Sequence, residues 1–88
     1  MGHGARHGLR RAATQAGRGR FVEAIESFDK ALLINPNDAA SHNGRGYALA
    51  GLERDIEALE AYNRAISLAG NATERAFLER RRDELSSR

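Results

Sequence analysis

Apolar residues recur at helical spacing between Phe21 and Ile34. The positions that follow the i, i+3, i+4, i+7 pattern are Phe21, Ala24, Ile25, Phe28, Ala31 and Leu32, and such a stripe is typical of an amphipathic helix. The segment Asn35-Pro36-Asn37-Asp38 is expected to end this helix, because the residue before a proline disfavours helical backbone. Asn37 or Asp38 is then available to cap the helix that follows.

Three further helices are predicted downstream. Residues 38–52 form one, weakened by Gly44, Gly46 and Gly51, so packing must stabilise it. Residues 54–69 form a second, which ends at Gly70. Its expected buried residues are Ile56, Leu59, Tyr62, Ala65, Ile66 and Leu68. A last helix is expected from the N-cap Thr73 to about Leu85, with its apolar residues at Ala76, Phe77, Leu78 and Leu85.

The pattern itself repeats with a period of 34 residues. Ala24, Phe28, Ala31, Ile34 and Pro36 recur without insertion as Ala58, Tyr62, Ala65, Leu68 and Gly70. A period of this length is typical of helix pairs that bury their apolar faces only against neighbouring pairs. The sequence therefore predicts a stack of helical hairpins.

Residues 1–20 differ in composition from the rest. They hold five of the nine glycines and five arginines with no acid, whereas residues 21–88 carry nine basic and twelve acidic residues. The first segment thus has a charge of +5 and the second of −3. We expect residues 1–20 to be a basic segment that is disordered or holds one weak helix, between Leu9 and Ala16, and residues 21–88 to be the helical domain.

The positions that repeat every 34 residues resemble the pattern of the tetratricopeptide repeat (TPR) family. Ala24, Phe28, Ala31 and Pro36 match the second helix of one repeat, and Gly46, Ala58, Tyr62 and Ala65 match both helices of the next. The resemblance implies an all-α antiparallel helix-turn-helix stack of about 1.5 to 2 repeats plus a C-terminal capping helix. It also implies a non-catalytic scaffold that binds a peptide or helix of a partner protein.

The chain departs from the family pattern at several positions. Gly70 replaces the usual proline, His42 the aromatic residue, Arg45 the leucine and Glu53 the turn glycine, while Gly8 and Arg11 match the first helix of repeat one poorly. Whether residues 4–16 form that helix stays open. Because about three repeats are usually needed for independent stability, self-association that covers an exposed face is one expectation.

The family's binding groove is lined by the first helices of the repeats. Projection of those positions gives Ala40, Asn43, Tyr47 and Ala50, with Phe77 and Arg81 on the last helix. Arg81 suits a carboxylate, and the amide of Asn43 suits a peptide backbone. The alternative is that Tyr47 and Phe77 belong to the core and that Asn43 is merely solvated.

Two alternatives to a protein-binding scaffold remain. Residues 65–85 are also similar to the helical C-terminal extension of some bacterial alternative sigma factors, which would make this a transcription-related fragment. Nucleic acid would then be held by the basic segment, at Arg6, Arg10, Arg11, Arg18 and Arg20, although interleaved aromatic residues for base stacking are missing there. The other alternative is a fragment or designed repeat without independent function.

The sequence favours neither catalysis nor metal binding. It has no cysteine and no phosphate-binding glycine loop. His3 and His7 lie at a metal-binding spacing but among glycines and without a third ligand. We expect no cofactor, no metal and no membrane span, and a cytoplasmic location.

Overall fold

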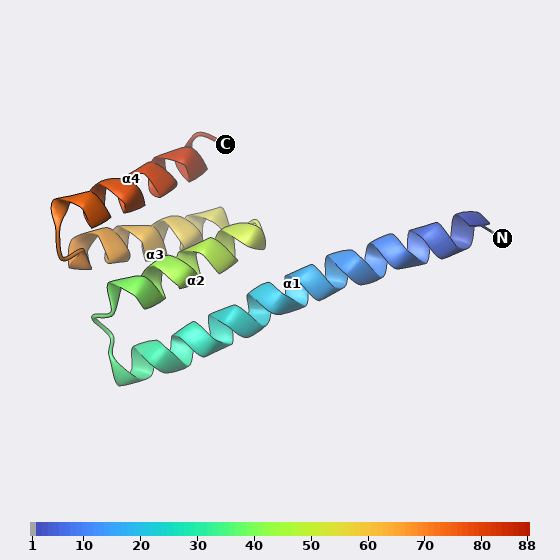
Figure 1. The fold of residues 1–88 in the computed structure, drawn as a ribbon, viewed down its shortest axis with the longest axis horizontal. Helices are drawn as coiled ribbons and strands as arrows, with labels where there is room; N and C mark the ends of the chain where they lie inside the picture. Colours follow the sequence, from blue (N-terminus) through green and yellow to red (C-terminus); the bar gives the residue numbers. More distant parts are fainter. Residues whose placement is uncertain (1) are drawn as a thin grey trace.

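The computed structural model describes the backbone of residues 2–88 and the side chains of residues 17–88. It consists of four helices, α1 (Gly2–Ile34), α2 (Ala39–Gly51), α3 (Asp55–Leu68) and α4 (Ala72–Ser86). Successive helices reverse direction and pack side by side in chain order (Figure 1). Residues 2–88 contain no strand. The predicted all-α stack of helix-turn-helix units with a C-terminal capping helix is therefore confirmed.

The first helix begins earlier than its apolar stripe predicts. α1 ends at Ile34 as expected, but it starts at Gly2 rather than Phe21 and passes through Gly17 and Gly19. A glycine inside a helix costs about 1 kcal/mol, which weakens a helix without forbidding it. In Figure 1 the N-terminal half of α1 extends away from the other three helices. The division of the chain at residue 20 stays a prediction.

The core lies between α2, α3 and α4. Leu49 and Ala58 are fully buried, and Tyr62 and Leu85 pack in the same cluster. α3 contacts α2 mainly through small residues, which let the two helices approach closely. Ile56, expected in the buried face of α3, is instead 78% exposed. The alanines of α3 turn toward α2, and this leaves Ile56 on the outer side.

The α1–α2 turn ends as the sequence predicts. Asp38 is the N-cap of α2: its carboxylate accepts hydrogen bonds from the Ala40 N–H (3.2 Å) and the Ser41 hydroxyl (2.6 Å). The hydrogen bond from Ser41 is the main reason why the pKa of Asp38 lies below its usual range.

At the start of α4 the cap is Asn71 rather than the expected Thr73. The Asn71 side chain accepts from the Glu74 N–H at 2.8 Å, because its extended backbone places the amide over the helix end.

The α2–α3 turn holds a residue in the left-handed region. Glu53 has a φ of 61°. Its N–H donates to the carbonyl of Ala50 at 3.0 Å, and the N–H of Arg54 donates to the carbonyl of Leu49 at 3.0 Å. This pair of bonds is the Schellman helix ending, in which the left-handed position is usually glycine. Glu53 therefore adopts a conformation that costs an L-residue energy.

We expect Glu53→Gly to stabilise the protein. Glycine adopts the left-handed conformation without steric cost, so the free energy of unfolding should rise by roughly 1 kcal/mol. Urea denaturation measures it. The matched control is Glu60→Gly, the same change at an exposed position inside α3, which should lower stability by about 1 kcal/mol. Equal losses in the two variants would contradict the prediction.

Candidate functional site

Two aromatic rings and one arginine form an exposed cluster on α2 and α4. The Arg81 guanidinium lies 5.3 Å from the centre of the Tyr47 ring and 4.9 Å from that of Phe77. Both rings are more than half exposed, at 56% and 52%. Contacts of this kind contribute about 0.5–1 kcal/mol at exposed sites. The cluster therefore lies on the surface, and neither ring is part of the core.

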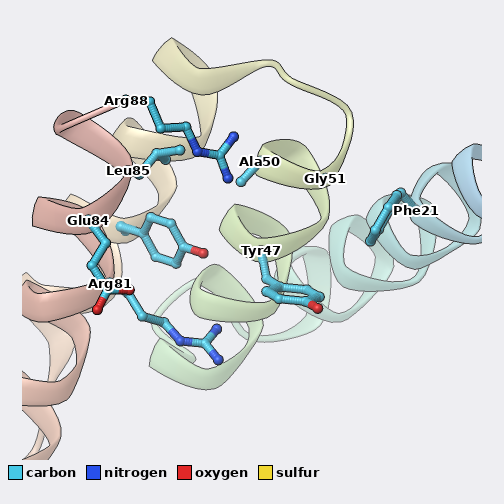
Figure 2. A pocket seen from close by; sticks show the side chains of 9 residues that line it. Phe21, Tyr47, Ala50, Gly51, Arg81, Glu84, Leu85 and Arg88 are labelled. Carbon is cyan, nitrogen blue, oxygen red and sulfur yellow. The ribbon is translucent and has the colours of Figure 1, made fainter.

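A cavity of about 370 Å³ opens beside this cluster. Figure 2 shows how the side chains enter it: Arg81 and Arg88 from the C-terminal segment, Tyr47 and Ala50 from α2, and Phe21 from α1. Phe21 meets Tyr47 edge to face, with ring centres 6.2 Å apart. The complete lining consists of Phe21, Tyr47, Ala50, Gly51, Tyr62, Arg81, Glu84, Leu85 and Arg88.

The cavity carries an excess of positive charge. Arg81 forms no ion pair with another residue whose side chain is described. Arg88 reaches Asp55 only at 3.6 Å, and Glu84 is the single acid in the lining. Burial raises the pKa of Tyr62, an effect that the charge of Arg81 opposes. An acidic group therefore suits this site better than a basic one.

The structure brings three of the six predicted groove residues together as this cluster, and a fourth, Ala50, lines the cavity. Ala40 is exposed on the first turn of α2, away from the lining residues. The side-chain oxygen of Asn43 is inaccessible to solvent and has no hydrogen-bond partner among the described residues, and Asn43 is not among the residues that line the cavity. Arg88 was not predicted, and it lies beyond the end of α4 at Ser86, so the pattern of that helix does not place it.

The residues expected to pack the repeats fall into two groups. Gly46, Ala58, Tyr62 and Ala65 are buried, whereas Ala24, Phe28 and Ala31 are half-buried and Pro36 is exposed. At Gly46 a Cβ atom would lie 3.0 Å from the Tyr62 ring, so the glycine permits close approach of α2 and α3. The corresponding residues of α1 have no helix on one side.

The other candidate sites gain less from the structure. Arg18 and Arg20 are exposed, while Arg6, Arg10 and Arg11 lie outside the residues whose side chains are described, as do His3 and His7. Within the described part of the chain, no three His, Cys, Asp or Glu residues gather as a metal site. No described helix is long and apolar enough to cross a membrane.

Comparison with family models gives the same repeat register as the helix pairs. Residues 17–52 match a model described as TPR repeat, and residues 39–71 match one described as tetratricopeptide repeat. The chain contains tetratricopeptide repeats. The second TPR match covers α2, α3 and the whole turn to α4, and the first covers the C-terminal half of α1 with α2. TPR repeats indicate a protein-interaction scaffold.

Several known TPR and receptor proteins are similar over part of this chain. The peroxisomal targeting signal receptor of Saccharomyces cerevisiae is 44% identical over 48 residues, which cover 54% of this chain and 8% of the receptor. Tetratricopeptide repeat protein 36 of Caenorhabditis elegans is 40% identical over 57 residues, 65% of this chain and 32% of that protein. The inactive TPR repeat-containing thioredoxin TTL3 of Arabidopsis thaliana is 39% identical over 51 residues, 58% of this chain and 7% of TTL3.

The TPR chain thus spans a third or less of the relatives it matches. No solved structure matches it. The similarity of residues 65–85 to the sigma-factor extension and the cytoplasmic location stay predictions.

Proposed function

We propose that this chain is a non-catalytic scaffold that binds an extended segment of a partner protein across α2 and α4. An acidic side chain of that segment would pair with Arg81, and an apolar one would enter the cavity beside it. The observation that carries the proposal is the position of Arg81, which lies between two exposed rings at a cavity with excess positive charge.

The residues of the cluster contact one another within the chain itself. Arg81 already contacts both rings, and Phe21 supports Tyr47 from behind. Contacts that already exist within the cluster would reduce the conformational entropy lost when a partner binds. A guanidinium stacked on rings still presents N–H donors at its edge, which suit a carboxylate in a bidentate arrangement.

The cavity also sets the size of what can enter. A volume of about 370 Å³ is at the lower end of the range for small-molecule sites, and its lining is both polar and apolar. It therefore fits a few side chains of a segment rather than the face of a folded domain. The apolar part of the lining comes from Leu85 and Ala50 and from the aromatic rings of Phe21, Tyr47 and Tyr62.

The partner can be found by photocrosslinking from the site itself. We would replace Tyr47 with a photoreactive phenylalanine in the full chain, irradiate it in lysate with and without nuclease treatment, and identify the products by mass spectrometry. The control carries the same group at Glu60, an exposed position on α3. A protein crosslinked from position 47 and not from 60 supports the proposal. Products that disappear with nuclease would favour the basic segment and nucleic acid instead.

We expect Arg81→Glu to weaken binding of that partner segment at least about tenfold, because a like charge would then face its acidic side chain. Isothermal titration calorimetry measures the change. The matched control is Arg75→Glu, which makes the same charge change at an exposed position of α4 outside the cavity lining. Its affinity should stay within about twofold of the original. Equal losses in both variants would reduce the effect to net charge and contradict the assigned site.

A further inference from the structure

The 34-residue period relates the pair α2 and α3 to residues that all lie within the single helix α1. Moved back by 34 positions, α2 corresponds to residues 5–17, and the turn residue Glu53 corresponds to Gly19. Glu53 is in the left-handed region and closes the Schellman ending of α2. At the matching position the chain has the residue that adopts this conformation without steric cost.

Gly19 has no packing role within α1 as it stands. Nothing lies within 4 Å of the place where a Cβ atom would be, and the same is true of Gly17. A glycine in a solvated helix interior destabilises the helix without compensation. By contrast, Gly44 and Gly51 in α2 lie against the rings of Phe28 and Phe21. The glycine at 19 therefore suits a turn better than a straight helix.

An apolar groove lies where a helix formed by the residues before such a turn would pack. A groove of about 520 Å³ runs along α1 and α2, and its apolar lining is Phe21, Ala24, Phe28, Gly44, Tyr47 and Ala48. One period later, α2 covers the equivalents of Ala24 and Phe28, which are Ala58 and Tyr62, and both are buried. Ala24 and Phe28 are only half-buried.

We propose that α1 opens at Gly19 and that residues 5–17 fold back as a separate helix into this groove, which completes the first repeat. The straight and folded-back forms are two states of one chain. The three residues 18–20 suffice for the turn, because the three residues 52–54 join α2 to α3. Tyr47 and Arg81 line both the groove and the neighbouring cavity, so closure alters the face that is offered to a partner.

Repeat register and residue size favour the chain's own segment as the occupant. The net charges of residues 1–20 (+5) and of residues 21–88 (−3) are opposite, but the charged residues that line the groove itself are Arg20 and Arg81, so charge at the groove does not select the basic segment. Ala12 takes the position of Gly46, where only a small residue allows close approach to the next helix.

A disulfide tests the two forms, because the chain has no cysteine of its own. In the full chain we would make Ala12→Cys with Ala24→Cys, the equivalents of Gly46 and Ala58. At Gly46 a Cβ atom would lie 3.3 Å from the Ala58 backbone oxygen, so a pair at these positions is close in the folded-back form. In a straight helix, residues 12 apart are separated by about 18 Å, far beyond disulfide reach.

The control pairs Ala12→Cys with Val22→Cys, on the side of α1 away from Ala24. We expect the first pair to form an intramolecular disulfide at the monomer mass of 9.6 kDa and the control pair to form none. A disulfide-linked dimer would overturn the proposal, since a second copy would then fill the groove. Absence of any disulfide, or equal yields from the two pairs, would overturn it as well.

Gly19→Ala in the cysteine pair gives a second reading. Alanine disfavours the left-handed turn, so the rate of disulfide closure should fall roughly five- to thirtyfold. The helical circular dichroism signal should not fall, because alanine favours the straight helix. A variant that misfolds would lose helix signal, which separates the two causes. An unchanged closure rate would show that the segment does not turn at Gly19.

Discussion

Ala58→Arg should unfold the helical body. Ala58 is fully buried between α2 and α3, and an arginine there would both overfill the contact and bury an unpaired charge. Each effect costs several kcal/mol, while a domain of this size has little stability to lose. We expect the cooperative thermal transition, followed by circular dichroism, to disappear.

Ala24→Arg, the same substitution 34 residues earlier, tests whether the loss of stability depends on the position in the repeat or on burial. From the sequence alone, Ala24→Arg is expected to unfold the protein as Ala58→Arg does, because Ala24 and Ala58 occupy the same position of the repeat. In the structure Ala24 lines an open groove and is only half-buried, so a long side chain can reach solvent. Ala24→Arg should therefore keep a cooperative transition. Unfolding by both variants to the same extent would contradict this.

Leu78→Ala should cost about 2–5 kcal/mol of unfolding free energy. Leu78 is 2% exposed and is among the largest fully buried side chains, and its truncation leaves a cavity where α4 meets the core. Because Arg81 is on the same helix, loosening α4 should also weaken binding at the proposed site. Urea denaturation gives the stability change.

Phe77→Ala is the control for that prediction. Phe77 is the larger side chain, but it is 52% exposed and contacts Arg81 rather than the core. Its truncation should cost less than about 1 kcal/mol, since little buried area is lost. If Phe77→Ala destabilised the protein more than Leu78→Ala, side-chain size would outweigh burial, and the assignment of α4 faces would be wrong.

Much of the fold follows from local patterns. The stripe from Phe21 onward ends at Ile34, where α1 ends, and Asp38 caps α2 as its side chain and position predict. These features depend on residues close together in the chain, so a sequence displays them directly. The wrong prediction of the α4 N-cap also concerns residues that are close together in the chain. Asn71 and Thr73 both suit a cap, and the extended backbone at Asn71 selects it.

The faces of the helices were less predictable. Ile56 and Phe77 are apolar residues at helical spacing, yet both are largely exposed. The periodicity of one helix defines a stripe about 100° wide, but a helix between two others has two contact sides, and its neighbours decide which residues they cover. The small residues Gly46, Ala58 and Ala65 are buried where α2 and α3 approach closely, whereas the larger Ile56 of α3 is exposed.

The candidate site shows the same division. Tyr47, Phe77 and Arg81 were predicted only as members of one face, and their mutual contacts arise because α2 and α4 lie on the same side of the stack. Arg88 comes from beyond the end of α4. Its approach to the cavity depends on where the last turn of the chain lies.

The helical repeat, its period and most of the helix ends could be predicted from the order of the residues, because these properties depend on spacing and on neighbouring residues. Only the tertiary structure decided which apolar residues are buried, which arginines meet the aromatic rings, and that one groove along α1 and α2 lacks a covering helix. Burial and charge density depend on distances between segments that are remote in the chain, and spacing along the chain does not contain those distances.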